Sequence, residues 1–494
     1  MKPQDRGAAE KVQNLSIVWF RQDLRVADNP ALIAASERGA IVPVFIWSPE
    51  DDGEWTPGAA SRFWLHQSLL ALSESLRALG STLVVRRGPA QEQLESLLNE
   101  SRATAIFWNR RYEPASIEHD KELKSRLQKT GIAAQSFNSH LLFEPWTVAN
   151  KTGNPFRVFT PYWKTCLALA EQVEIPRPLP APRKLLAPQR ALKSLALDEL
   201  SLEPEIDWAK GIRDTWEPGE KGAEKNLKTF LREGLGRYAD TRNQPALRGT
   251  SRLSPYLHFG EISPRQIWHG TKEAAESISR TDKAWRNSQF FSEIGWREFA
   301  HHLLFHFPKT TTEPMQEKFK EFTWEKNESW LEAWQRGQTG YPIVDAGMRE
   351  LWATGWMHNR VRMVAASFLI KDLLQPWRLG ARWFWDTLVD ADLANNTLGW
   401  QWSAGCGADA APFFRIFNPV TQGEKFDPHG EYVRRWIPEI ANLPDQWIHQ
   451  PWRAPAEILM RATLKLGDDY PEPIVSHTIA REVALERYAK IKKS

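Results

Sequence analysis

The chain has few cysteines, no long apolar run and no excess of charge of either sign. Only Cys166 and Cys406 occur among its 494 residues, which excludes a disulfide framework, a four-cysteine zinc site and an iron–sulfur cluster. No apolar run reaches the roughly 18 residues of a membrane span, and the polar segment Met1 to Asn14 has no apolar signal region. With 64 Lys and Arg against 61 Asp and Glu, nucleic-acid binding would need a local basic patch. We expect an intracellular protein of two to three domains.

Common motifs for phosphate binding and nucleophilic catalysis are also missing. The chain has no G-x-G-x-x-G after its first expected strand, no G-x-x-x-x-G-K-[ST] loop and no G-x-S-x-G elbow. The first 140 residues nevertheless alternate short β-branched and aromatic runs with helical stretches. We expect strands at Ser16–Phe20, Ile41–Trp47, Thr82–Arg87 and Ala105–Asn109, with helices at Ala59–Leu79 and Pro89–Asn99. This alternation predicts an α/β domain with a doubly wound parallel sheet.

The pattern changes after this domain. Prolines cluster between Ile175 and Pro188, which predicts an extended linker. From about residue 222, helical periodicity replaces the strand pattern, most clearly at Asn287–Phe305 and His358–Leu374. We therefore expect three parts: an α/β domain at 1–140, an interdomain linker at 141–221 and a mostly α-helical domain at 222–494.

Tryptophan is unusually frequent, with 25 residues against 8 tyrosines. Its flat ring suits stacking on other rings, and it also fills protein cores. Both explanations stay open for any single tryptophan.

The segment that ends RGTSRLSPYLHFGEIS combines hydroxyl groups, a glycine and a cation just before an expected helix. Gly249, Thr250, Ser251, Arg252 and Ser254 provide these groups. Such a turn suits a phosphate or diphosphate. A helix N-cap without any ligand explains the same residues.

The segment FFSEIGWREFAHHLLFHF places Glu293, Trp296 and Arg297 on one helical face. A carboxylate, a flat ring and a cation together suit a nucleobase and its phosphate. An intrahelical ion pair beside a core tryptophan is the alternative.

The same helix carries residues at metal-ligand spacing: Glu298, His301, His302 and His306. A carboxylate-bridged metal pair would need a second Glu-x-x-His, which the chain lacks. We predict no metal site here.

Two later segments combine amides, acids and aromatic rings. Asn359, Arg362 and Met363 lie within one helical turn, and they suit the edges of a heterocycle or an ordinary amphipathic helix. The run DADLANNTLGWQWSAGCGAD adds a second set: Asp390, Asp392, Asn395, Asn396, Trp400 and Trp402. Its acids suit ribose hydroxyls or a partner arginine, or else a solvated surface.

Together these segments resemble the DNA photolyase/cryptochrome family. The motifs are VWFRQDLRVADNPAL, GTSRLSPYLHFGEISPRQ, WREFAHH, GYPIVDAGMRELWATGWMHNRVRMVAASFLIKDLL and DADLANNTLGWQWSAGCGADAAPFFRIFNPVTQGEKFD, in the family's order and over nearly the whole chain. The segment FIWSPEDDGEWTPGAASRFWL is most similar to the bacterial subgroup related to plant cryptochromes, class III, with class I as the other type considered. The resemblance implies an α/β antenna domain and a helical domain that binds FAD.

The resemblance also implies where FAD binds. The implied cofactor residues are Tyr238, Thr250, Ser251, Arg252, Leu253, Ser254, Arg362, Asp390, Asp392 and Asn396. Arg362 would pair with Asp390 beside the isoalloxazine ring, and Asn396 would face flavin N5. Plant cryptochromes are similar but have Asp at that place, so Asn396 favours repair.

The implied reaction is light-driven repair of a cyclobutane pyrimidine dimer, flipped out of DNA, by an electron from reduced FAD. The implied catalytic residues are Glu293, Trp296, Asn359, Met363 and Trp402, with Glu293 stabilising developing charge. The implied phosphate contacts are Arg297, Arg360 and Gln422, and the implied electron relay is Trp400, Trp377 and Trp324. Met363 favours the cyclobutane dimer, because the eukaryotic enzymes for the (6-4) lesion and animal cryptochromes have histidine there, while the bacterial (6-4) group carries an iron–sulfur cluster that two cysteines cannot build.

An antenna chromophore is the remaining implication, with methenyltetrahydrofolate preferred to deazaflavin. Trp47 would stack on it and Glu113 would bond it, or both are domain-interface residues. We expect a monomer that acts on damaged DNA in the bacterial cytoplasm, at the nucleoid, without membrane or metal. The alternatives are a cryptochrome-type blue-light photoreceptor and a light-independent DNA- or RNA-binding protein.

Overall fold

The structure is a computed structural model that describes residues 14–278 and 288–492. Most of the polar N-terminal segment Met1 to Asn14, and Asn287 at the start of one expected helix, lie outside these residues. No helix within the described ranges is both long and apolar enough to cross a membrane.

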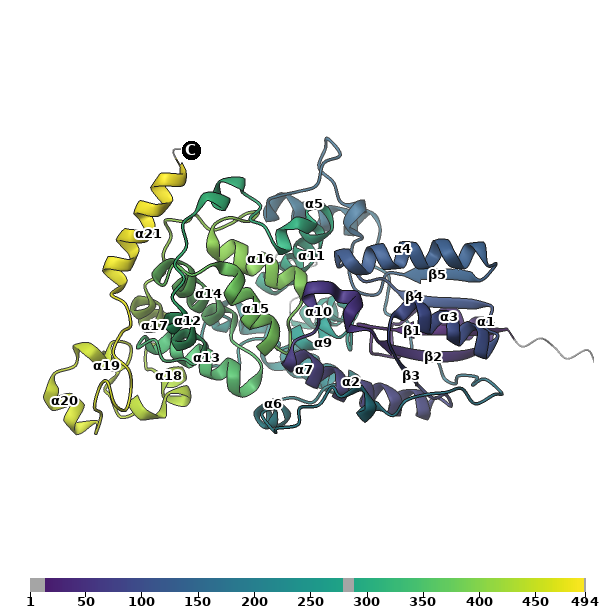
Figure 1. The fold of residues 1–494 in the computed structure, drawn as a ribbon, viewed down its shortest axis with the longest axis horizontal. Helices are drawn as coiled ribbons and strands as arrows, with labels where there is room; N and C mark the ends of the chain where they lie inside the picture. Colours follow the sequence, from purple (N-terminus) through teal and green to yellow (C-terminus); the bar gives the residue numbers. More distant parts are fainter. Residues whose placement is uncertain (1–13, 279–287, 493–494) are drawn as a thin grey trace, which may run out of the picture.

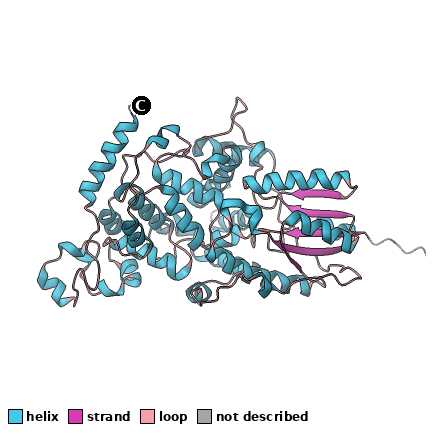
Figure 2. Ribbon diagram, viewed as in Figure 1, coloured by secondary structure: helices cyan, strands magenta, loops and turns pink. Residues whose placement is uncertain are grey.

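A five-stranded parallel sheet forms the N-terminal part and lies at one end of the molecule (Figures 1 and 2). Its strands follow the order β3-β2-β1-β4-β5, which confirms the predicted doubly wound sheet. The strands are β1 (Leu15–Phe20), β2 (Ala40–Trp47), β3 (Val84–Arg87), β4 (Ala105–Asn109) and β5 (Ala133–Phe137). The connecting helices are α1 (Pro30–Arg38), α2 (Ala59–Ala78), α3 (Ala90–Ser101) and α4 (Pro114–Lys129).

Sequence patterns predicted four of these strands but missed β5. Its residues are Ala-Ala-Gln-Ser-Phe, of which only Phe137 is a large apolar residue, and none is fully buried, because β5 is an edge strand that pairs only with β4. Edge strands need little apolar surface, so the β-branched and aromatic run that predicted the other strands is missing there. Strand β3 also begins at Val84, two residues later than expected.

The segment 141–221 contains the helices α5 (Phe159–Gln172) and α6 (Lys210–Thr215). Its proline-rich stretch has neither helix nor strand, as expected. It is nevertheless attached to the sheet domain: the amide of Leu185 donates to the carbonyl of Leu79, and the amide of Ile41 donates to the carbonyl of Leu186, both at 2.8 Å. The two boundaries between the three expected parts, after residues 140 and 221, stay a prediction.

The remaining residues form a helical assembly at the other end of the molecule (Figure 1). Its helices up to α14 are α7 (Glu220–Glu233), α8 (Tyr238–Thr241), α9 (Ser254–His258), α10 (Pro264–Ile278), α11 (Gln289–His306), α12 (Glu328–Gln335), α13 (Pro342–Thr354) and α14 (Asn359–Ser367). The others are α15 (Trp377–Thr387), α16 (Leu393–Ala404), α17 (Pro419–Phe426), α18 (Glu431–Trp436), α19 (Asp445–Ile448), α20 (Ala456–Arg461) and α21 (His477–Lys492). Helix α16 packs against α11, α14 and α15.

The expected helix at His358–Leu374 differs from the structure in its second half. Helix α14 ends at Ser367, and a π-helical turn at Phe368–Asp372 follows. In this turn Lys371 donates to the carbonyl of Arg415 at 3.0 Å, and Asp372 pairs with His477 at 2.5 Å. These buried polar contacts come from distant segments, so helical periodicity alone does not predict the wider turn.

The two parts of the molecule share an apolar core. One buried cluster joins Phe20 and Trp64 of the sheet domain to Tyr162, Phe259 and Phe291 of later segments. This shared core fixes the sheet domain against α9 and α11, on which several of the predicted site residues lie.

Candidate functional site

The loop before α9 has a conformation that suits an anion. Arg252 has a φ of +52°, and the following Leu253 is right-handed at φ −90° and ψ −5°. Within the described residues, the backbone amides of positions 250–253 donate no hydrogen bond. Successive free amides around a left-handed residue form a concave anion site. The Arg252 guanidinium lies 4.7 Å from the ring centroid of Trp356, which holds this cation at the same turn.

A buried carboxylate lies next to this loop. Arg362 on α14 donates to Asp390 Oδ2 at 2.8 Å, and Ser254, the first residue of α9, donates to the same oxygen at 2.6 Å. The expected pair of Arg362 and Asp390 is therefore present. The other oxygen, Asp390 Oδ1, is buried and has no partner among the described residues. A buried polar atom without a partner is costly, so a bound ligand that donates to it would be favoured.

Asp392 begins α16 and orients its first turn. Its Oδ1 accepts the backbone amide of Asn395 at 2.8 Å, as an N-cap does. The next residue, Asn396, donates from Nδ2 to the carbonyl of Ala381 at 3.0 Å. This contact fixes the amide, and Oδ1 of Asn396 accepts no hydrogen bond from any described residue.

Tyr238 and Glu293 lie on either side of an arginine that the sequence analysis did not select. The Arg242 guanidinium lies 5.6 Å from the Tyr238 ring centroid and donates to Glu293 Oε1 at 2.5 Å. Gln289 donates to the same Glu293 oxygen at 3.0 Å. Burial, together with Glu293, raises the pKa of Tyr238, so its hydroxyl stays protonated. Arg242 follows α8 directly, and its place in the sequence gave no signal of this contact.

The expected substrate residues are partly open to solvent. Trp296 and Trp402 are half-buried, and the Trp296 ring stacks on Phe159 with centroids 3.8 Å apart and an angle of 9°. On α14, Asn359 is exposed and Met363 is half-buried. Each of these four side chains therefore keeps some solvent-accessible surface, although Phe159 covers one face of the Trp296 ring.

Two of the three expected phosphate contacts are accessible. Arg360 is half-buried, donates to Asn243 Oδ1 at 2.8 Å and lies over the Phe426 ring. Gln422 on α17 is half-buried as well.

The prediction that Arg297 contacts DNA phosphates is wrong. Arg297 is 9% exposed, and its guanidinium bonds the His140 carbonyl at 2.8 Å and His140 Nε2 at 2.7 Å. Burial lowers the pKa of Arg297, and the charges of Glu298 and Asp392 oppose this effect. Although Arg297 shares a helical face with Glu293 in sequence, its side chain is buried against His140, whereas Glu293 is only half-buried.

Phe414 is a further residue that the sequence analysis did not select. It is 63% exposed in the loop that follows α16, between buried Phe413 and exposed Arg415. An exposed aromatic ring can insert into a base stack, and the neighbouring cation can pair with a phosphate. The run Phe413-Phe414-Arg415 in an irregular segment was the available signal.

The three tryptophans expected to form a relay come from segments in or next to α15. Trp400 and Trp377 are 2% and 5% exposed, and Trp324 is half-buried. Gly380, one turn after Trp377 on α15, faces the Trp400 ring so closely that an added Cβ would lie 2.0 Å from it. Glu325, next to Trp324, donates its amide to the carbonyl of Leu374, one turn before Trp377. Trp400 thus packs on the first turn of α15, and the segment that carries Trp324 is bonded to the chain just before that helix.

Histidines at the domain interface have the geometry of a possible metal site. Potential ligand atoms of His140, His301 and Asp392 all lie within 4.8 Å of one another. His140 Nε2, however, lies 2.7 Å from the Arg297 guanidinium. A fixed cation at this distance disfavours a metal ion, so the group is better described as a hydrogen-bonded charge network. His302 and His306 bond backbone groups of Phe156 and Pro145.

The two expected antenna residues have little surface or hydrogen-bonding capacity left for a chromophore. Trp47 ends β2 and is 8% exposed. Glu113 Oε2 accepts from Arg111 Nε at 3.2 Å, and Arg111 also donates to Asp52 at 3.0 Å. Burial would raise the pKa of Glu113, but Arg111 holds it below its ordinary value. Glu113 is thus an ionised partner of Arg111.

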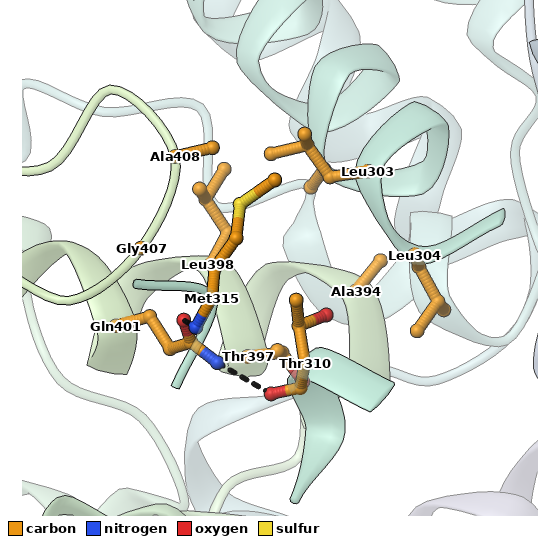
Figure 3. Close-up of a pocket in the computed structure, with 11 residues that line it drawn as sticks. Leu303, Leu304, Thr310, Met315, Ala394, Thr397, Leu398, Gln401, Gly407 and Ala408 are labelled. Atoms are coloured by element: carbon orange, nitrogen blue, oxygen red, sulfur yellow. Dashed lines mark hydrogen bonds between the residues drawn. The ribbon is translucent and has the colours of Figure 1, made fainter. Parts of the chain in front are cut away.

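A small apolar cavity lies between α11 and α16 (Figure 3). Its volume of about 20 Å³ suits about one water molecule, so it is too small for a flavin. Thr397, Leu398 and Gln401 line it from α16, and Gln401 donates to the carbonyl of Thr310 at its edge. Asn396 and Trp400 belong to another face of α16, toward α15.

Comparison with known proteins gives the family. Residues 16–183 match the DNA photolyase family model, and residues 290–490 match the model of the FAD binding domain of DNA photolyase. A deoxyribodipyrimidine photo-lyase of Agrobacterium fabrum is 49% identical over 97% of this chain and 98% of its own length. Cryptochrome-2 of Arabidopsis thaliana is 41% identical over 98% of this chain and 80% of its own length.

A solved structure agrees with these matches. A bacterial class III photolyase from Agrobacterium tumefaciens superimposes with a TM-score of 0.94 at 48% identity, over 99% of this chain and 100% of that one. The chain therefore belongs to the DNA photolyase/cryptochrome family, as its motifs predicted.

Proposed function

We propose that the protein is a light-driven photolyase that uses FAD to repair cyclobutane pyrimidine dimers in DNA. The observation that carries the proposal is the buried, unpartnered Asp390 Oδ1 beside the free amides of positions 250–253. These groups fit a ligand with both an anionic diphosphate and a hydrogen-bond donor, and FAD has both. The 49% identity to a photo-lyase, against 41% to a cryptochrome, favours repair over signalling.

FAD, when bound, absorbs the light and supplies the electron that opens the dimer and then returns. The residues of the chain bind and orient it. The amides at 250–253 hold the diphosphate, while Tyr238 closes one side with its buried ring. Arg362 and Asp390 hold a fixed charge pair beside the ring system. Asn396, whose Nδ2 already bonds Ala381, presents Oδ1 as an acceptor for the N–H that reduced flavin has at N5.

The dimer is bound by side chains that keep accessible surface. Trp402 and the open face of Trp296 pack against the extruded bases, and Asn359 and Met363 contact their edges. Glu293 stabilises the charge that develops on the dimer, and Arg242 keeps its carboxyl group in place.

The DNA backbone is bound by a patch next to this opening. Arg360 and Gln422 contact phosphates, and exposed Arg415 adds a cation. Phe414 fills the gap that the extruded dimer leaves in the base stack. Arg297 has no part in this surface.

Trp324, Trp377 and Trp400 form the relay that reduces the flavin under light. The two buried tryptophans are shielded from water, and half-buried Trp324 can exchange electrons with the outside. The packing of Trp400 against Gly380 of α15, and the hydrogen bond of Glu325 to Leu374 just before α15, support this order.

The antenna and the cellular setting complete the proposal. Methenyltetrahydrofolate is the antenna, bound near Trp47 and Glu113, although the ion pair of Glu113 with Arg111 leaves little free capacity there. The protein acts as a monomer in the bacterial cytoplasm and meets the nucleoid through damaged DNA.

A blue-light photoreceptor that signals through a partner is the second candidate. The 41% identity to a plant cryptochrome over 98% of this chain favours it.

Repair of a thymine-dimer oligonucleotide tests the two candidates. Purified, chemically reduced protein is incubated with the substrate under blue or near-ultraviolet light and in the dark. We expect intact thymines only in the light. Flavin-loaded protein that restores no thymines under light would contradict the repair proposal and favour the photoreceptor.

A further inference from the structure

His301 on α11 has no role in the proposed repair reaction, yet it is buried beside the flavin-site acid Asp392. It is 3% exposed, and its Nε2 lies 3.4 Å from Asp392 Oδ2. Its ring meets the ring of His140 edge-on, with centroids 5.1 Å apart.

The hydrogen bonds of His301 define its protons. Nδ1 lies 3.0 Å from the main-chain carbonyl oxygen of Arg297, which can only accept, so Nδ1 donates. Nε2 faces a carboxylate oxygen of Asp392, which also only accepts when ionised. A neutral ring beside an ionised Asp392 would set two lone pairs against each other. One further proton is therefore present, either on His301 Nε2 or on Asp392.

The surrounding groups assign this proton to the histidine. Asp392 Oδ1 accepts the main-chain amide and the Nδ2 group of Asn395 at 2.8 and 2.6 Å, and both hydrogen bonds stabilise the ionised carboxylate. Burial would raise the pKa of Asp392, but the charge and hydrogen bond of His301 hold it well below its ordinary value. The other titratable groups that face the pair, from the sheet domain, α9 and α11, are His140, Tyr112, Glu113, His258, Arg297 and Glu298.

We propose that His301 is a positioning residue: a buried imidazolium that pairs with Asp392 and so fixes the first turn of α16, which carries Asn396. This inference deepens the proposed function, because it rests on Asn396 facing the flavin. The connection is short, since the amide of Asn396 donates to the carbonyl of Asp392 at 2.8 Å and the Asp392 carboxylate caps Asn395. The imidazolium also neutralises a buried anion beside the site, which favours the more electron-rich, reduced flavin.

Nuclear magnetic resonance of the holoprotein tests the protonation state directly. Histidine labelled with ¹⁵N is observed at neutral pH in the dark, and His301 is assigned by comparison with His301→Gln. We expect both ring nitrogens of His301 to show the shifts of protonated imidazolium. A neutral ring would overturn the proposal, whether or not the protein repairs DNA.

The midpoint potential of bound FAD tests the positioning role. We expect a shift to more negative values in His301→Gln, which removes the charge, and recovery toward the wild-type value in His301→Lys, which keeps it. His306→Gln, on the same helix but bonded to Pro145, is the matched control and should leave the potential unchanged. An unchanged potential in flavin-loaded His301→Gln would contradict the positioning role. If His301→Gln does not retain FAD, the resonance measurement on the wild-type holoprotein decides.

A wild-type protein that repairs nothing but has a cationic His301 would refute the proposed repair and keep the inference about His301. A protein that repairs dimers but has a neutral His301 would support the proposed repair and refute the inference about His301.

Discussion

The sheet domain and the helical assembly both carry clusters of buried charge, but they use them differently. At the ends of the strands, charged side chains pair with each other: Arg21 bonds Asp120 at 2.9 and 3.1 Å, and Arg111 bonds Asp52 and Glu113. In the helical assembly, Asp390 keeps one oxygen without a partner, and four amides beside it are free within the described residues.

This difference separates groups that stabilise the fold from groups that can bind a ligand. An unpaired buried polar group costs roughly 1–3 kcal/mol, and a bound ligand can recover that energy. In the sheet domain the carboxylates of Asp120, Asp52 and Glu113 are paired with arginines within the chain, although Arg21 Nε itself has no partner among the described residues. The comparison therefore assigns FAD to the helical assembly and a structural role to the ion pairs of the sheet domain.

The largest expected effect comes from removing Arg362. Arg362→Ala leaves the buried Asp390 carboxylate with Ser254 as its only hydrogen-bond partner in the described part of the chain. Breaking a buried pair on one side costs about 3 kcal/mol, so we expect lower stability in urea unfolding and loss of FAD on purification. Arg111→Ala in the sheet domain is the matched control and should lose stability while retaining FAD. Wild-type FAD content in Arg362→Ala would contradict the comparison.

Removing the middle tryptophan of the relay should separate photoreduction from repair. Trp377→Phe is expected to abolish light-driven reduction of the flavin, because phenylalanine is much harder to oxidise. Repair by chemically reduced enzyme should remain. Trp334→Phe is the control, since Trp334 also contacts Trp400, with centroids 6.2 Å apart. Loss of both activities in Trp377→Phe would mean that this tryptophan is structural.

Removing the carboxyl group at the dimer should lower repair without releasing FAD. We expect Glu293→Ala to reduce the repair yield by up to roughly 10²-fold. This is the lower end of the roughly 10²- to 10³-fold loss that follows removal of one group that stabilises developing charge. Flavin absorbance after gel filtration measures retention of the cofactor. Unchanged repair by flavin-loaded Glu293→Ala would remove Glu293 from the site.

The smallest effect is expected at the exposed aromatic residue of the DNA surface. Phe414→Ala should weaken binding to dimer-containing duplex by about 1–2 kcal/mol, roughly 10-fold, because it loses one stacking contact. Binding to a single strand should change less, since no gap in a duplex has to be filled. Equal losses on both substrates, measured by fluorescence anisotropy, would contradict the proposed role.

The sequence predicted the parts of the fold that depend on local pattern. Buried parallel strands stand out as short apolar runs and long amphipathic helices by their 3.6-residue period, and both were found. Edge strand β5 and the π-helical turn at Phe368–Asp372 were missed, because pairing and distant polar contacts determine them.

For the site, too, the sequence predicted some residues and missed others. Family motifs named Arg362 and Asp390, and the structure brings them together. Helical spacing alone placed Arg297 with Glu293, but it does not show which side of a helix faces a neighbouring domain, and Arg297 is buried against His140. Arg242 was missed because its partner lies 51 residues away in the chain.

The comparison of the two regions is tested most directly by FAD content and light-dependent dimer repair in two variants that each remove one carboxylate charge. Asp390→Asn changes the unsatisfied site, and Glu113→Gln changes the paired one. The account predicts that Asp390→Asn loses FAD and repair, whereas Glu113→Gln keeps FAD and repairs dimers under light absorbed by the flavin. Retention of both by Asp390→Asn, or loss of FAD from Glu113→Gln, would contradict it.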